Sequence, residues 1–369
     1  MGAEVIDRGA KGVASMDHLT KLGSSLEVPN VQELAKEKPP RVPERYIRHD
    51  RDQEEPVLPQ YSPEIPVVDL QKLLDESSMD SELHVLHTAC QQWGFFQLIN
   101  HGVDISVLEK MKSEIQEFFN LPVQVKKKFN QEPGDIEGYG QAFIVSEEQK
   151  LDWGDIFYMV TMPVSLRKPH LIPKLPSSFR DAIETYSKEL KILAMKILHQ
   201  MAKALDMDNE DMVTLFEDGL QAIRMNYYPP CPQPELVTGL CPHSDAIGLT
   251  ILLQVSDTNG LQIKKDGVWI PVTPRPNAFI INIGDILEIV TNGSYPSIEH
   301  RATTNSEKER LSIATFLSPK LDGVFGPAPS LVSNEKPAKF KSIGLAEYLR
   351  GYFSRELVGR SYLDTMRIS

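Results

Sequence analysis

The chain has 369 residues, of which 41% are hydrophobic and 24% are charged, so it is long and apolar enough for a sizeable globular core. Its formal net charge is −12 and no block of lysine and arginine interleaves with aromatic residues, which argues against nucleic acid as a partner. Three cysteines without a Cys-x-x-Cys spacing, Cys90, Cys231 and Cys241, argue against a disulfide framework and for a reducing compartment.

The beginning of the chain lacks the features of a targeting segment. Its first residues contain neither the cationic start nor the apolar run of a secretory signal. Gly2 invites a myristoylation reading, but position 6 is Ile6 rather than serine or threonine, so the motif fails. No apolar stretch is long enough to cross a bilayer. We therefore expect a cytoplasmic protein that makes no membrane contact, whereas the oligomeric state is not predicted.

The first half of the chain reads as an arm followed by a mixed, mostly helical region. Residues 1–60 are polar and interrupted by proline, which predicts an arm lying over a core, with a short helix at 30–36. The mostly helical region is expected at 61–220. Within it the pattern predicts strands at 65–70 and 95–100 and helices at 82–92, 105–119 and within 176–220. Residues 131–140 predict a loop, and the aromatic residues between 143 and 157 are expected on irregular chain.

The second half changes to short, closely spaced runs of β-forming residues. These predict strands at 223–228, 248–255, 261–264, 268–272, 278–283, 297–303 and 311–316. Turn dipeptides separate several of them, at Asn259-Gly260, Asp266-Gly267 and Asn292-Gly293. Helices first and short strands afterwards predict a mainly β core, an antiparallel barrel or jelly roll, surrounded by a helical layer. We expect the core at 221–320 and a helical tail at 321–369.

Two histidines and one aspartate form the strongest candidate for a metal site. His243 and Asp245 stand two apart in Pro242-His243-Ser244-Asp245, so in extended chain both side chains leave the same face. His300 is distant in sequence and must come from another strand folded back beside them. Two imidazoles and one carboxylate on one side of a ferrous ion leave three positions open for substrate and oxygen.

A cation and a hydroxyl follow in Arg310-Leu311-Ser312, where the two polar side chains share one strand face. A guanidinium offers two parallel N–H donors, which suits the far carboxylate of a dicarboxylate cosubstrate. Arg224 lies on another predicted strand and alternates with polar residues. A buried arginine needs an anion, and for Arg224 the sequence leaves open whether a protein carboxylate or a bound ligand supplies it.

At these residues the chain resembles a known family, the plant soluble iron(II)- and 2-oxoglutarate-dependent dioxygenases. The likeness extends from Ile65 to Phe316. Its further motifs are Trp93-Gly94-Phe95-Phe96-Gln97, Asn100-His101-Gly102, Asn226-Tyr227-Tyr228-Pro229-Pro230-Cys231, Asn292-Gly293 and Glu299-His300-Arg301. Within the family the chain looks most like the branch of senescence-related and alkaloid O-demethylase enzymes, chiefly through residues 224–235 and 249–254. Two departures, Pro296 and Cys241, lie outside the expected ligand set.

The resemblance implies a double-stranded β-helix, with iron at the mouth of the jelly roll and no catalytic side chain beyond the metal ligands. The residues implied to bind Fe(II) are His243, Asp245 and His300. The residues implied to hold 2-oxoglutarate are Arg310, Ser312, Tyr228 and Asn226. The residues implied to line the substrate pocket are Phe316, Phe143 and Tyr139.

The activity expected from the resemblance is hydroxylation or O-demethylation of a mid-sized plant specialised metabolite or hormone-like molecule. The partners would be the small-molecule substrate, O2 and 2-oxoglutarate, with ascorbate as reductant and succinate and CO2 as products. Two other readings of the same residues stay open. His/His/Asp also suits the zinc ion of a hydrolase, although that leaves Arg310 without a role, and a non-catalytic binding protein would use the same barrel. The sequence does not identify the substrate.

Overall fold

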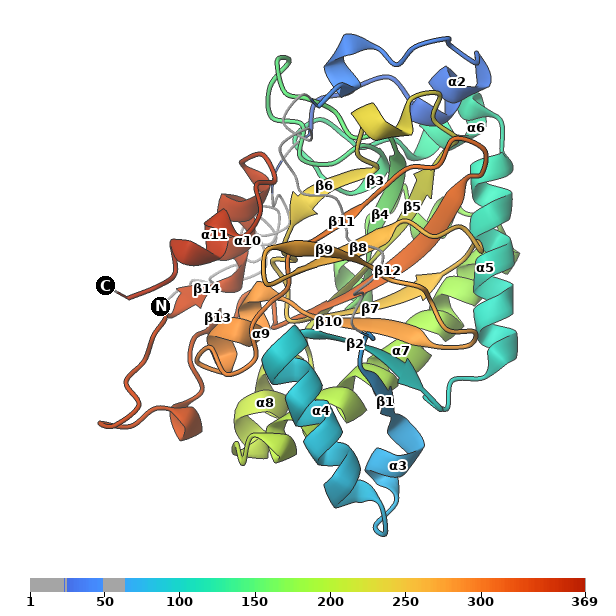
Figure 1. Ribbon diagram of the computed structural model, residues 1–369. Coiled ribbons are helices and arrows are strands. Elements are labelled where there is room, and N and C mark those ends of the chain that lie inside the picture. Colours follow the sequence, from blue (N-terminus) through green and yellow to red (C-terminus); the bar gives the residue numbers. More distant parts are fainter. Residues whose placement is uncertain (1–22, 24, 49–63, 369) are drawn as a thin grey trace, which may run out of the picture.

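The computed structural model describes residues 23, 25–48 and 64–368 (Figure 1). The predictions for the first residues, on a secretory signal and on myristoylation, therefore lie outside the described chain. Residues 1–22, 24 and 49–60 of the predicted arm lie outside the described chain as well. No helix in the described ranges is both long and apolar enough to cross a membrane.

The larger sheet has eight strands, and two neighbouring inner strands, β12 (Arg310–Ser318) and β5 (Leu220–Tyr228), are buried along their whole length. In spatial order the strands are β1 (Val67–Asp69), β2 (Phe95–Ile99), β10 (Phe279–Ile283), β7 (Leu249–Gln254), β12, β5, β4 (Asp155–Met162) and β3 (Gly138–Gly140). All neighbours pair antiparallel except β1 with β2. Strands that are covered on both faces read as continuous apolar runs, which is the pattern of β10.

The smaller sheet has four strands, and its edge strand β6 carries the first of the candidate metal ligands. In order they are β6 (Leu240–His243), β11 (His300–Ala302), β8 (Leu261–Lys265) and β9 (Val268–Pro271). The two sheets together form the jelly roll, so the predicted fold class is confirmed. A separate two-stranded ribbon joins β13 (Val324–Phe325) to β14 (Ile343–Gly344).

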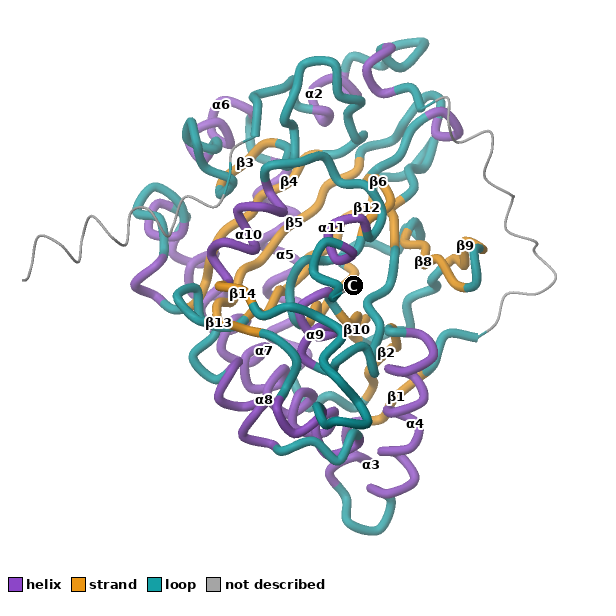
Figure 2. The backbone as a smooth tube through the Cα atoms, turned by 90° about the vertical axis from the view of Figure 1, so that its left-hand side faces the viewer, coloured by secondary structure: helices purple, strands orange, loops and turns teal. Residues whose placement is uncertain are grey.

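Helices from the first half of the chain cover one side of the larger sheet (Figures 1 and 2). The long helix α7 (Ser177–Ala204) contacts β4 and β7, and α4 (Met79–Trp93), α5 (Ile105–Asn120) and α8 (Asn209–Phe216) pack against it. The shorter helices are α2 (Val31–Lys36), α3 (Leu70–Leu74), α6 (Val123–Lys126), α9 (Asp285–Val290), α10 (Leu345–Phe353) and α11 (Ser361–Asp364). The 3-10 turns lie at Glu44–Tyr46, Lys127–Phe129, Val164–Leu166, Ile172–Lys174, Pro234–Leu236 and Pro329–Leu331.

Gly94 ends α4 and brings that helix against the turn that leads to β11. Its φ of +60° is left-handed, and its N–H donates to the carbonyl oxygens of Ala89 and Cys90, which closes the helix end. A side chain here would collide with the carbonyl oxygen of Pro296, which lies 2.2 Å from the position of an added Cβ. The glycine therefore allows a close approach as well as a turn.

The predicted helix at 30–36 is confirmed, but its cap comes from elsewhere. The side chain of Asn30 makes no capping hydrogen bond. Instead, the buried carboxylate of Asp155 accepts hydrogen bonds from the N–H groups of Val31 and Gln32, each at 2.9 Å. This contact anchors the described part of the arm to β4.

Three expectations for the secondary structure are wrong. The predicted loop 131–140 ends in β3, and the aromatic segment read as irregular chain contains β4. Both faces of β4 bear apolar side chains, which hides the two-residue alternation of a strand. The short helix α9 lies within a part of the core for which only strands were expected. The helices expected within 176–220 are confirmed as α7 and α8.

Candidate functional site

Two histidines and an aspartate converge where β6 meets β11. The antiparallel register sets His300 directly opposite His243, with 4.3 Å between their ring centroids. Asp245 follows β6, and its Oδ1 lies 3.5 Å from Nε2 of His243 and 3.7 Å from Nε2 of His300. The expectation that His300 returns on a neighbouring strand is confirmed.

Each imidazole is held with its Nε2 atom toward the aspartate. Nδ1 of His243 lies 2.8 Å from the carbonyl oxygen of Cys241, and Nδ1 of His300 lies 3.2 Å from that of Ile298. A carbonyl oxygen only accepts, so each Nδ1 carries the proton and each Nε2 keeps its lone pair. Among the described residues, Nε2 of His243 is buried without a hydrogen-bond partner, which leaves its lone pair available to a metal ion.

The carboxylate of Asp245 is oriented by two side chains from the larger sheet. Its Oδ2 accepts a hydrogen bond of 2.6 Å from Oγ1 of Thr250 and one of 2.9 Å from Nδ2 of Asn282. Thr250 and Asn282 are direct partners across β7 and β10. Because they occupy Oδ2, the other oxygen stays directed at the two imidazoles.

The charges of the three side chains suit a divalent cation. Burial and the neighbouring His243 lower the pKa of His300 to about 4, so its imidazole is neutral near neutral pH. Burial alone would raise the pKa of Asp245, but His300, His243 and the Thr250 hydroxyl together hold it well below its usual range. Ligand atoms of all three residues lie within 4.8 Å of one another. Two imidazoles and a carboxylate on one side fit the open site of Fe(II).

Arg310 and its predicted companions form the opposite end of the same cavity. On neighbouring strands Arg310 pairs with Tyr228 and Ser312 pairs with Asn226, so all four side chains share one face. They line a single cavity together with His300 and the aspartate. The structure thus brings together the metal ligands and the cosubstrate residues that the sequence analysis singled out.

The guanidinium of Arg310 is buried and its neighbours are neutral. Its Nη2 donates to Oε1 of Gln254 at 3.0 Å, its central carbon lies 5.4 Å from the ring centroid of Tyr228, and its Nε has no partner in the part of the chain that the structure describes. Burial lowers the pKa of Arg310, and Tyr228 partly offsets this effect. A buried cation without a counter-ion is costly, so this end of the cavity favours an anionic ligand.

Arg224 projects from β5 into the space between the cosubstrate end and the remaining wall. It is 8% exposed, and its guanidinium lies 5.5 Å from the ring centroid of Phe316. Its Nε has no hydrogen-bond partner, and within the described chain it forms no ion pair with a carboxylate. Of the two partners that the sequence left open, this surrounding favours a bound ligand.

The second wall of the cavity is apolar and aromatic. Phe143 stacks on Phe353 with 5.3 Å between ring centroids and meets Tyr352 edge-on. This wall reaches the metal end, because the pocket that it lines also contains His243 and Asp245. The other apolar residues around it are Ile136, Ala142, Ile156, Tyr158, Ala246, Ile247, Phe316 and Leu349. Phe143 and Phe316 both line this pocket.

Tyr139 does not reach this pocket, so its expected place is corrected. On β3 it pairs with Phe157, and its ring packs on Phe118 and Phe119 of α5. Ile156, the neighbour of Phe157 on β4, lines the pocket instead. Successive residues of a strand point to opposite faces, so Tyr139 lies on the helix-covered side.

Several residues of the site were missed. Thr250 and Asn282 orient the aspartate, and a lone polar residue inside the apolar run Phe279–Ile283 was a usable signal for Asn282. Tyr352 and Phe353 come from α10, whose amphipathic pattern predicted a packed helix but not the surface that it covers. That surface depends on tertiary packing, for which the local sequence carries no signal.

Comparisons with known proteins agree with this geometry. Residues 219–319 match the model of the 2OG-Fe(II) oxygenase superfamily, and residues 65–175 match the N-terminal model described as non-haem dioxygenase in morphine synthesis. The first match contains all three metal-ligand candidates and Arg310.

Full-length relatives extend the likeness over most of the chain. It is 63% identical to oxoglutarate-dependent flavonoid 7-O-demethylase 1 of Ocimum basilicum, covering 94% of this chain and 93% of that protein. It is 51% identical to thebaine 6-O-demethylase of Papaver somniferum, covering 95% and 99%. Among solved structures, JOX2 in complex with 2OG, Fe and JA matches with a TM-score of 0.84 and 35% identity, over 93% of this chain and 99% of that one.

Proposed function

Since the chain belongs to the 2OG-Fe(II) oxygenase superfamily, an enzyme family that uses iron and 2-oxoglutarate, we propose that its own reaction is the O-demethylation of a methoxylated aromatic plant metabolite. The observation that carries the proposal is the aromatic wall around Phe143 and Phe353, which continues to His243 and Asp245 at the metal end of the cavity. Stacked and edge-on rings favour a flat ring system as ligand. Relatives named for flavonoid and alkaloid O-demethylation support the same substrate class.

In this proposal the protein contributes binding and orientation. His243, Asp245 and His300 hold the iron from one side, while Arg310 and Ser312, assisted by Tyr228 and Asn226, hold the far carboxylate of 2-oxoglutarate. With iron bound, the reaction takes up O2, oxidises 2-oxoglutarate to succinate and CO2, and hydroxylates the methyl carbon, whose hemiacetal releases formaldehyde and leaves a phenol. Arg224 faces the substrate and donates hydrogen bonds to one of its oxygen atoms, so that a single methoxy group points to the metal.

The two alternative functions find no support. A zinc hydrolase has no use for the buried guanidinium of Arg310, which shares its cavity with His300. Both matching family models describe oxygenases, and the two relatives reported above are named as demethylases rather than as binding proteins. The enzyme class is therefore that of the superfamily.

The remaining parts of the proposal concern the setting of the reaction. We propose a cytoplasmic enzyme with ascorbate as reductant, in keeping with three cysteines that are all free and buried. We also propose the division of labour expected from the sequence, with residues 221–320 as catalytic core, 61–220 as supporting region, 1–60 as arm and 321–369 as tail.

The test is an assay with a panel of methoxylated flavonoids and benzylisoquinoline alkaloids, using Fe(II), 2-oxoglutarate, ascorbate and air. The expected products are lighter than their substrates by CH2, with formaldehyde and succinate formed in equal amounts and no product without oxygen. The matched controls are the same ring systems without methoxy groups. Products that are heavier by one oxygen, with no formaldehyde, would replace O-demethylation by ring or alkyl hydroxylation.

A further inference from the structure

The segment that follows α10, residues 357–368, pairs with β6, the strand that carries His243, and reaches the turn before β11 through Glu288; we call it the C-terminal latch. Figures 1 and 2 both place it beside α10 and near β6. Gly359 forms a β-bridge with His243: its N–H donates to the carbonyl oxygen of Pro242 at 3.0 Å, and its own carbonyl oxygen accepts from the N–H of Ser244 at 3.1 Å. Since β6 is an edge strand, the latch pairs with an edge that the smaller sheet leaves free.

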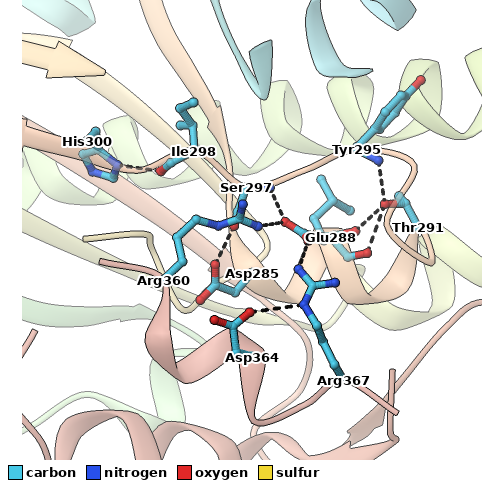
Figure 3. Close-up of polar contacts among 11 residues, drawn as sticks. Asp285, Glu288, Thr291, Tyr295, Ser297, Ile298, His300, Arg360, Asp364 and Arg367 are labelled. Atoms are coloured by element: carbon cyan, nitrogen blue, oxygen red, sulfur yellow. Dashed lines mark hydrogen bonds and ion pairs between the residues drawn. The ribbon is translucent and has the colours of Figure 1, made fainter. Parts of the chain in front are cut away.

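Two arginines of the latch form ion pairs with one buried glutamate. Glu288 of α9 is 3% exposed. Its carboxylate pairs with Arg360, and its Oε1 lies 3.3 Å from Nη2 of Arg367, which also binds Asp364 at 3.2 Å (Figure 3). A buried carboxylate requires such partners, so the charge of Glu288 holds the latch in place.

The same glutamate reaches the second metal strand. Its Oε2 accepts a hydrogen bond of 2.6 Å from the N–H of Ser297, whose hydroxyl donates to Oδ1 of Asp285 at 2.7 Å. The next residue, Ile298, supplies the carbonyl oxygen that orients His300 (Figure 3). The turn that delivers His300 is thus held by α9, and α9 is held by the latch.

The backbone of the segment that carries Asp245 is also hydrogen-bonded to α9 and α10. The backbone N–H of Asp285 donates to the carbonyl oxygen of Asp245 at 2.8 Å. The hydroxyl of Tyr352, a residue of the aromatic wall, donates to the carbonyl oxygen of Ser244 at 2.9 Å. α9 and α10 therefore both hold the backbone of the segment that carries Asp245.

We propose that the C-terminal latch is a positioning element of the metal centre, in which Arg360 and Arg367 act through Glu288 to keep His243 and His300 at the spacing that binds one ion. The inference rests on the proposed role of the two histidines as iron ligands. Neither arginine touches the metal or the substrate. Partners behind the direct ligands alter metal affinity by about 10- to 100-fold, and the lower end of that range applies to residues that act through a further side chain.

The test measures iron binding rather than turnover. Fe(II) is titrated without oxygen into the full-length protein with 2-oxoglutarate, and the dissociation constant is compared with the melting temperature of the metal-free protein. The variant is the double substitution Arg360→Gln and Arg367→Gln. We expect its iron dissociation constant to rise about tenfold at a temperature where circular dichroism shows it folded.

Two matched controls separate positioning from general stability. Arg355→Gln removes an exposed arginine of the same tail, which stacks on Tyr362 and does not touch Glu288, and it should bind iron as the unchanged protein does. Arg360→Lys keeps the charge beside Glu288 and should restore most of the affinity lost in Arg360→Gln. A folded double variant with unchanged iron affinity overturns the proposal, as does an equal loss in the Arg355 control.

The readout also distinguishes this proposal from the proposed function. If the unchanged protein binds no iron, the metal site itself is wrong. If it binds iron and the double variant binds equally well, only the latch is wrong. Should the double variant fail to fold, Arg367→Gln alone takes its place, because that side chain is 45% exposed. A smaller loss of iron affinity then supports the latch, and an unchanged affinity overturns it.

Discussion

The two walls of the cavity are built in different ways. The wall around Arg310 and Ser312 consists of neighbouring residues on β5 and β12, two strands buried along their whole length. The wall around Phe143 and Phe353 combines a loop with a helix near the end of the chain. A strand pair fixes the relative positions of its side chains through register, whereas loop and helix can be replaced without disturbing the sheet.

This difference indicates which wall determines specificity for 2-oxoglutarate and which determines specificity for the substrate. The rigid wall suits 2-oxoglutarate, which is the same molecule whatever the substrate. The aromatic wall suits the substrate, because its residues can change while the sheet keeps its register. Substitutions in the first wall should therefore act on the cosubstrate, and substitutions in the second should act on the substrate.

The largest effect is expected for Arg310→Ala. Loss of a buried, charge-assisted pair costs about 3 kcal/mol, so the KM for 2-oxoglutarate should rise roughly 100-fold. Steady-state kinetics at saturating substrate measure this. Arg275→Ala, at an exposed position, serves as control. An unchanged requirement for 2-oxoglutarate would remove Arg310 from the cosubstrate site.

Arg224→Gln tests the residue that lies between the two walls. If its guanidinium binds a substrate oxygen, the KM for the substrate should rise about tenfold, as one charged hydrogen bond of about 1.5 kcal/mol predicts. The KM for 2-oxoglutarate should stay constant. A substrate analogue that lacks the oxygen should lose nothing, and an equal loss with both compounds would contradict this role.

Phe353→Ala should have a smaller effect, confined to the substrate. Removing one ring of the stacked pair with Phe143 takes away about 1 kcal/mol of contact, a factor of roughly five in substrate KM. Preference should shift toward bulkier rings. Ile192→Ala, on the exposed side of α7, is the control for truncation. A change in the KM for 2-oxoglutarate instead would show that the two walls are coupled.

The smallest effect is a pH dependence of stability through Asp155, the buried residue of β4 that caps α2. Burial raises the pKa of this carboxyl from 3.8 to about 6. The folded state then binds more protons than the unfolded state, so the contribution of Asp155 to the unfolding free energy falls as pH rises from 3.8 to about 6. Urea unfolding across this range should show that slope, and Asp155→Asn should lack it. Parallel curves for the two proteins would contradict the shift.

The same contrast explains how much of the molecule was predictable. The pairs His243 with Asp245 and Arg310 with Ser312 follow from the two-residue period of strands, and the jelly roll follows from the order of helices and strands. Tyr139, which the resemblance implied for the substrate pocket, packs on α5 instead, and its segment shows no apolar alternation from which the face could be predicted. The contribution of Tyr352 depends on where α10 packs, which no local pattern encodes.

The cap of α2 and the ion pairs that hold the C-terminal latch could not be predicted from the sequence either. Asp155 caps a helix that begins far earlier in the chain, and Glu288 binds two arginines of the tail. Both are contacts between residues far apart in the sequence, and the sequence offers many acidic residues that look the same. Burial distinguishes them, since both carboxylates lie in the interior, and burial at single polar positions requires the folded structure.

The most direct test of the proposed iron site is an anaerobic visible spectrum of the protein with Fe(II) and 2-oxoglutarate. His243, Asp245 and His300 converge on one point, and Arg310 faces them across the cavity. We therefore expect a weak visible charge-transfer band that saturates at one iron per chain. His243→Ala should abolish the band. No band in the unchanged protein, or the same band in His243→Ala, would contradict a ferrous centre held by these three side chains.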